Sequence, residues 1–176
     1  MLKTSSTQLS GIFPYIADDE YSIEDAARLL AQSTVGDGHI FVCGLQEMQG
    51  IIYEATEGIE ALPYFKALPD TKALNTLTST DRVLLITRYH DDKEAIEIAN
   101  SLYELQIPFV ALSTIKDTAQ AGLQDLADVH IDLKLKRGLV PTETGERMGF
   151  PSLLTALYAF HGISLTLKEL LDELEE

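Results

Sequence analysis

The chain has 176 residues, with 28 acidic and 13 basic side chains and a formal net charge of −15. A surface this acidic repels the phosphates of nucleic acids and of anionic membranes, so we expect neither as a partner. Residues 1–10 lack the apolar core of a signal peptide, and no apolar run has the length of a membrane span. The single Cys43 cannot form an internal disulfide and lies in an apolar run, where a buried, inert thiol is expected. We therefore expect one domain in the reducing cytoplasm.

The first third of the chain predicts two helices and the first strand. Residues 2–17 favour a helix that Pro14 interrupts, and a second helix is expected to start at Ser22 with Asp25 in the capping-box position. A glycine-rich turn at residues 36–38 leads to a buried strand at 39–43 and a helix at 46–57. A short strand at 62–68 and a short helix at 70–77 follow.

Residues 81–114 form the unit around which the rest is organised. Residues 82–87 are a continuous apolar run, as in a strand that is buried on both faces. Asp91 then offers a helix N-cap, with Glu94 three residues later to close a capping box. Residues 109–113 are a second buried strand. Two strands joined by one helix must lie parallel, with a right-handed crossover.

The last part of the chain completes an α/β pattern. Residues 129–136 alternate between apolar and polar side chains and predict a half-buried strand at the edge of the sheet. A polar loop at 137–149, an apolar helix at 150–161 and an acidic helix capped by Thr166 are expected after it. The sequence thus predicts a single domain: a doubly wound three-layer sandwich with a mostly parallel sheet of about five strands and flavodoxin-like topology. Its parts are N-terminal helices at 1–35, the α/β core at 39–136 and C-terminal helices at 149–176.

In open parallel sheets, ligands bind beyond the carboxyl ends of the strands. A small polar ligand is therefore expected between residues 44–49 and 87–92, where Thr87 can donate a hydroxyl hydrogen bond and Arg88 can clamp an anion. His90 would attract an anion when protonated. Asp91 and Asp92 have two interpretations: they cap the following helix, or they repel an anion at its N-terminus.

The order of elements, with strand–loop–helix units at 39–57 and 82–105, resembles the sugar isomerase (SIS) domain, and within it the phosphoheptose isomerases. The stretch GLVPTETGERMGFPSLLTALYAFHG is most similar to a small group of uncharacterised SIS-like proteins from relatives of Bacillus. The resemblance implies a sugar phosphate as ligand, with phosphosugar isomerisation as one function. The substrate-binding residues expected from the loops and the resemblance together are Gly44, Gln46, Glu47, Thr87, Arg88, His90, Asp91, Asp92 and Thr114.

The phosphate loop departs from the SIS pattern. SIS domains carry a Ser-x-Ser-Gly-x-Ser/Thr loop that wraps a phosphate with hydroxyl and backbone N–H groups. Here Thr87 keeps the first hydroxyl, whereas Tyr89, His90 and Asp92 replace the second serine, the glycine and the last hydroxyl. After the first strand, only Gly44 matches.

The resemblance also implies catalytic candidates. Phosphoheptose isomerases use a glutamate from the helix after the first strand and a histidine from the last long helix for acid–base transfer through an enediol. Glu54 and Glu57 lie on the first of these helices and His161 on the second. The other interpretation of His161 is a residue that caps the carbonyls of its helix or packs in the core. The remaining histidines are scattered, so we expect no metal and no cofactor.

Two questions stay open at this level. The basic cluster of Lys134, Lys136 and Arg137 could close over an anion, or it could be a solvated edge. The alternative to a sugar-phosphate enzyme is a non-catalytic dimeric regulatory or scaffold module on a SIS fold whose phosphate loop has degenerated. The helix at 150–160 is apolar around most of its circumference, which together with the resemblance predicts a homodimer or a higher symmetric oligomer.

Overall fold

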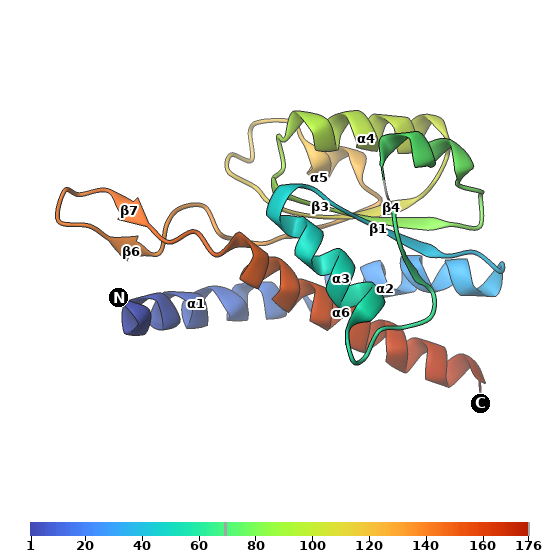
Figure 1. The fold of residues 1–176 in the computed structure, drawn as a ribbon, viewed down its shortest axis with the longest axis horizontal. Coiled ribbons are helices and arrows are strands. Elements are labelled where there is room, and N and C mark those ends of the chain that lie inside the picture. Colours follow the sequence, from blue (N-terminus) through green and yellow to red (C-terminus); the bar gives the residue numbers. More distant parts are fainter. Residues whose placement is uncertain (69, 176) are drawn as a thin grey trace.

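A parallel five-stranded sheet lies between two layers of helices (Figure 1). The computed structural model describes residues 1–68 and 70–175. The sheet contains β1 (Ile40–Gly44), β2 (Phe65–Ala67), β3 (Arg82–Tyr89), β4 (Phe109–Thr114) and β5 (Val129–Asp132). Its order is β2-β1-β3-β4-β5 and every neighbouring pair is parallel. This is the strand order of flavodoxin-like doubly wound sheets, so the predicted fold class is confirmed.

The two faces of the sheet are covered by different parts of the chain. One face carries α1 (Leu2–Ala17), α2 (Glu20–Val35), α3 (Gln49–Glu57) and α6 (Ser152–Glu175). The other carries α4 (Lys93–Glu104) and α5 (Leu123–Leu126). Short 3-10 turns, η1 (Gln46–Met48) and η2 (Thr71–Thr76), follow β1 and β2.

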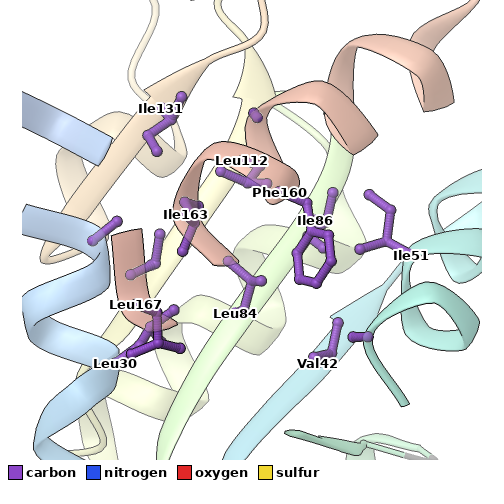
Figure 2. Packing of buried hydrophobic residues seen from close by; sticks show 14 of the residues in the cluster. Leu30, Val42, Ile51, Leu84, Ile86, Leu112, Ile131, Phe160, Ile163 and Leu167 are labelled. Carbon is purple, nitrogen blue, oxygen red and sulfur yellow. The ribbon is translucent and has the colours of Figure 1, made fainter. Parts of the chain in front are cut away.

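Each face has its own apolar core because successive side chains of a strand point to opposite faces. In β3, Leu84 and Ile86 belong to the core under α2, α3 and α6 (Figure 2), whereas Val83 and Leu85 belong to the core under α4. A strand that faces two cores must be apolar at every position. The uninterrupted apolar run in the sequence has this origin.

Some predicted helix boundaries are wrong. The second helix starts at Glu20, so Ser22 lies inside α2 and caps nothing. The two helices expected near the C-terminus are one continuous helix, α6. The Thr166 hydroxyl donates to the carbonyl oxygen of Gly162 one turn earlier, at 3.0 Å, as a threonine inside a helix does. Buried Ile163 and Leu167 continue the apolar face through this segment.

The region after β4 also differs from the expectation. α5 has a single turn, and β5 ends at Asp132, where the Lys134 ammonium pairs with the Asp132 carboxylate at 3.2 Å. The predicted polar loop contains a small antiparallel hairpin of β6 (Val140–Pro141) and β7 (Arg147–Met148). Figure 1 shows this hairpin extending away from the sheet on the side where α1 begins. None of the helices in the described ranges combines the length and the apolarity needed to cross a membrane.

Candidate functional site

The carboxyl edge of the sheet has a switch point between β1 and β3. From β1 the chain continues through α3 to β2 on one side, and β3 lies on the other side. At such a point the loops diverge and leave a crevice, which is where ligands bind in doubly wound folds. The two loops that leave β1 and β3 at this switch point are residues 44–49 and 87–92.

The first loop turns sharply as it leaves β1. A Cβ on Gly44 would lie 2.2 Å from the carbonyl oxygen of Met48, so only glycine fits there. Gln46 has a positive φ of 53°, which is uncommon for a residue with a side chain. The N–H of Leu45 still bonds the carbonyl oxygen of Ile86 at 2.9 Å, which holds the start of the loop to β3. The turn sends the next side chain, Glu47, toward the end of β3.

Glu47, Arg88 and Ser152 meet at this edge of the sheet, and we call these three residues the Arg88 clamp. The guanidinium donates from Nε to Glu47 Oε1 at 2.8 Å and from Nη2 to Oε2 at 2.7 Å. The Ser152 hydroxyl donates to the same Oε1 at 2.5 Å. The hydrogen bonds from Arg88, above all, lower the pKa of Glu47 to about 2. The clamp therefore consists of an ionised carboxylate held by a cation and a hydroxyl.

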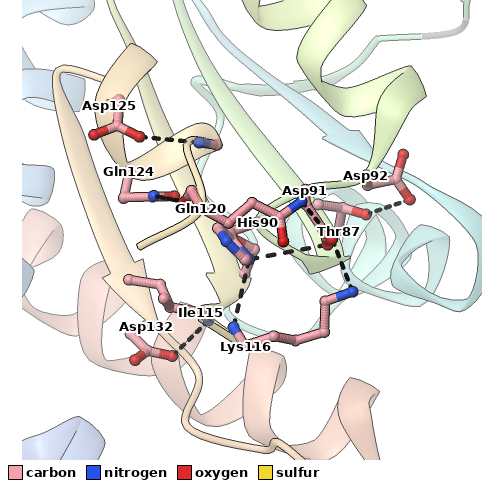
Figure 3. A network of polar contacts seen from close by, with 12 residues as sticks. Thr87, His90, Asp91, Asp92, Ile115, Lys116, Gln120, Gln124, Asp125 and Asp132 are labelled. Atoms are coloured by element: carbon pink, nitrogen blue, oxygen red, sulfur yellow. Dashed lines mark hydrogen bonds and ion pairs between the residues drawn. The ribbon is translucent and has the colours of Figure 1, made fainter. Parts of the chain in front are cut away.

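In the second loop, the Asp92 carboxylate accepts hydrogen bonds from neighbouring residues (Figure 3). Asp92, and not Asp91 as predicted, is the N-cap of α4: its Oδ1 accepts from the N–H of Ala95 at 3.1 Å. The buried Thr87 hydroxyl donates to Asp92 Oδ2 at 3.2 Å. Asp92 stands where SIS domains carry the last hydroxyl of the phosphate loop, and here it serves as a helix cap.

Asp91 pairs with a cation from another loop. Its Oδ2 lies 2.8 Å from the Lys116 ammonium, which also sits 4.6 Å from the ring centroid of Tyr89. Burial works to raise the pKa of Asp91, but the hydrogen bond and charge of Lys116 outweigh it and hold this pKa below its usual value. Gln120 adds a donor at 3.3 Å. Asp91 therefore faces the β4–α5 connection.

His90 and Thr114 are packed inside the protein. His90 is fully buried, and its Nδ1 accepts from the N–H of Lys116 at 3.4 Å. A Cβ on Gly122 would lie 2.7 Å from the His90 ring, so the start of α5 presses on the imidazole. The backbone of Thr114 accepts from the N–H of His90 at 3.1 Å, and Thr114 is 2% exposed. Neither side chain opens onto the crevice surface.

A hollow of about 750 Å³ lies beside the crevice, between α3, the end of β2 and the start of α4. Gly44 and Gln46 line it, together with the carboxylates of Glu57, Asp70 and Glu94. The described lining contains no lysine, arginine or histidine. Cys43 also borders the hollow, and burial raises the pKa of its thiol to about 11, in agreement with the expectation of an inert thiol.

The catalytic candidates separate into two places. Glu54 Oε1 and His161 Nε2 lie 3.7 Å apart across α3 and α6, at a small depression of about 20 Å³. Their side chains are 40% and 51% exposed. Glu57 lies in the acidic hollow instead. His161 does not cap a helix end, because α6 continues to Glu175. In residues 1–68 and 70–175 no three metal-binding side chains converge.

Sequence reasoning missed Ser152 and Lys116. Ser152 follows Pro151 at the first position of α6, a signal for a helix start that the expected boundary at Phe150 obscured. Lys116 lies in a loop with no motif around it, and nothing local marks it as the partner of Asp91.

Comparison with known proteins places these features in a family. Residues 1–171 match the family model described as "Domain of unknown function (DUF2529)". The uncharacterized protein YwjG of Bacillus subtilis is 48% identical over 175 residues, which cover 98% of this chain and 99% of that protein. The predicted kinship with a Bacillus-type group is confirmed.

Solved structures of other proteins share the fold of this chain. The NanR protein of Vibrio vulnificus, solved with ManNAc-6P, superposes with a TM-score of 0.70 at 16% identity over 98% of this chain; the chain spans 62% of that protein. The phosphoheptose isomerase GmhA of Neisseria gonorrhoeae superposes with a TM-score of 0.64 at 14% identity, over 95% of this chain and 99% of that one. The SIS fold is thus shown, and the chain belongs to the family described as Domain of unknown function (DUF2529).

Proposed function

We propose that this protein binds a small sugar phosphate at the carboxyl edge of the sheet, between residues 44–49 and 87–92, and that it acts as a binding module. The supporting observation is the Arg88 clamp, in which Arg88 and Ser152 already hold a carboxylate with three hydrogen bonds. The same donors suit the oxygen atoms of a phosphate. The NanR structure contains ManNAc-6P, which supports a sugar phosphate as the ligand class.

The binding is expected to be weak. Glu47, Asp91 and Asp92 place three carboxylates at the two loops, and each repels a dianion. We expect a dissociation constant of roughly 0.1–1 mM, equivalent to about 4–5.5 kcal/mol.

Titration calorimetry with sugar phosphates tests the proposal. Arg88→Ala should weaken binding by at least about tenfold, because it removes the bidentate donor. Arg28→Ala is the matched control, since Arg28 is an exposed arginine on α2 that also pairs with a glutamate, Glu24. Equal affinities of wild type and Arg88→Ala would place the ligand elsewhere.

Isomerase activity is the second candidate, and the Glu54–His161 pair is the observation that favours it. A glutamate and a histidine at this distance could pass a proton through a sugar enediol. The depression beside them, about 20 Å³, is too small for a sugar, and Glu57 lies in a separate hollow, which supports binding without catalysis.

Incubation of a ketose or aldose phosphate in D₂O measures catalysis directly, because an enediol exchanges the C2 or C1 proton with solvent. We expect no incorporation above the protein-free rate. Deuterium incorporation that is lost in Glu54→Gln and in His161→Gln would establish the isomerase instead.

We also propose that the protein is a homodimer or a higher symmetric oligomer. Apolar side chains on α1 and α6 remain exposed, among them Leu2 at 87%, Tyr15 at 67% and Leu165 at 58%. Burial of such surface between subunits would be favourable. Light scattering after size exclusion at micromolar concentration tests this, and the mass of a single chain would contradict it.

A further inference from the structure

We propose that Glu47 is an internal competitor of the ligand: its carboxylate occupies the anion site of the Arg88 clamp and must leave before a phosphate can bind there. This inference rests on the proposed function and adds a specificity-determining residue to the same site. Glu47 thereby sets how strongly the anionic group of a sugar phosphate is held, and Ser152 becomes a second donor to that group.

The geometry of the clamp is that of a bound anion. One carboxylate oxygen accepts from Arg88 Nε and from the Ser152 hydroxyl, and the other accepts from Arg88 Nη2. Ser152 is the first residue of α6, a 24-residue helix whose dipole favours negative charge at this end. Two oxygen atoms of a phosphate would meet the same three donors, so phosphate and Glu47 cannot occupy the clamp together.

The side chain of Glu47 is placed so that it can leave. The ion pair is partly open to water, with 39% of the Arg88 side chain and 30% of the Glu47 side chain exposed. The preceding residue, Gln46, is exposed and holds the positive φ of 53°, a conformation that a side chain disfavours. Rotation of the Glu47 side chain, or relaxation of Gln46, moves the carboxylate into solvent without disturbing β1.

The exchange has a quantitative consequence. A ligand that binds only to the open form has an apparent dissociation constant that is raised by the inverse of the open fraction. If the clamp is closed on Glu47 in about nine of ten molecules, phosphate binding is weakened about tenfold. Removal of the Glu47 charge should therefore strengthen phosphate binding by about tenfold.

The test compares Glu47→Gln with wild type by titration calorimetry, with inorganic phosphate and with glucose 6-phosphate as probes. Glu47→Gln keeps the shape of the side chain and removes its charge, so we expect about tenfold tighter binding of both probes. Glu97→Gln, an exposed change on α4, removes the same charge away from the clamp and should not alter affinity. In the double variant Glu47→Gln, Arg88→Ala the gain should disappear, since the guanidinium that receives the phosphate is absent.

A second variant separates displacement from simple charge removal. Glu47→Asp keeps the charge, but its side chain is one methylene shorter, so its carboxylate cannot reach both Arg88 and Ser152. This variant should therefore bind phosphate more tightly than wild type, but less tightly than Glu47→Gln. If Glu47 serves only to stabilise the loop, both variants will lower the melting temperature and neither will bind phosphate more tightly. That result overturns the inference about Glu47, whether or not the wild-type protein binds phosphate. The proposed function is tested separately, by whether the wild-type protein binds a sugar phosphate at all.

Discussion

His130 should make the stability of the protein depend on pH between 7 and 5. Its Nε2 lies 2.7 Å from the hydroxyl of Ser113, which is fully buried in β4. Burial is the main cause that lowers the pKa of His130 to about 4, while the charge of Asp132 acts in the opposite direction. The folded protein therefore keeps this imidazole neutral at a pH where an unfolded chain protonates it.

The sign and size of the effect follow from proton linkage. Below a pH of about 6.5 the unfolded chain binds a proton that the folded protein does not, so the free energy of unfolding decreases as the pH falls, until the folded group titrates near pH 4. Between pH 7 and pH 5 the loss is about 2 kcal/mol, because the slope rises toward about 1.4 kcal/mol per pH unit as the unfolded chain becomes protonated. The carboxylates with lowered pKa values, such as Glu47 and Asp91, lose their contribution only at lower pH.

Urea unfolding at pH 7 and at pH 5 measures this for wild type and for His130→Gln. Glutamine can still bond Ser113 but does not titrate, so the variant should lose about 2 kcal/mol less than wild type over the interval. Equal losses of unfolding free energy in His130→Gln and wild type would refute this role of His130.

The remaining predictions concern single side chains. Asp81→Asn should lower the free energy of unfolding by about 2–4 kcal/mol in urea, because Oδ2 accepts from Thr78 and Oδ1 accepts from the N–H of His39, and an amide can replace only one of these oxygens. A loss under about 1 kcal/mol would contradict this. Gly44→Ala should cost more than about 3 kcal/mol, since its Cβ would clash with the Met48 carbonyl oxygen, and an unchanged melting temperature would be inconsistent with that contact. Asp92→Ser should keep the cap of α4 and strengthen phosphate binding by about 1 kcal/mol, as measured by calorimetry; no gain would mean that this carboxylate does not oppose the ligand.

Much of the fold could be predicted because its signals are local. The run at residues 82–87 is apolar at every position, which only a strand between two cores requires, and it indicates β3 directly. The sequence predicts two C-terminal helices because Thr166 offers a cap for a second one. In the structure, burial of Ile163 and Leu167 against the sheet outweighs this weak signal and α6 continues.

The site could be predicted only in part because its contacts are distant in sequence. The sequence predicts that Arg88 binds an anion. Its partner in the structure is Glu47, 41 residues earlier in the chain, and the Ser152 hydroxyl that also bonds Glu47 is 105 residues after Glu47. The backbone turn at Gln46 decides which carboxylate reaches Arg88. Gln46 has a positive φ, and no pattern of residues in the sequence predicts it. The separation of Glu54 from Glu57 likewise depends on how α3 packs against α6.

The division of the two helical layers has a consequence for how the protein is made. The face under α4 and α5 is covered by residues that leave the ribosome soon after β3 and β4. The opposite face needs α6, whose Phe160, Ile163 and Leu167 complete the core with α2 and are synthesised after all five strands of the sheet (Figure 2). Until then the nascent chain carries an open apolar surface on one side of a half-built sheet, the kind of surface that chaperones bind. Because the Arg88 clamp includes Ser152, the binding site and this second core are completed in the same late step of biosynthesis.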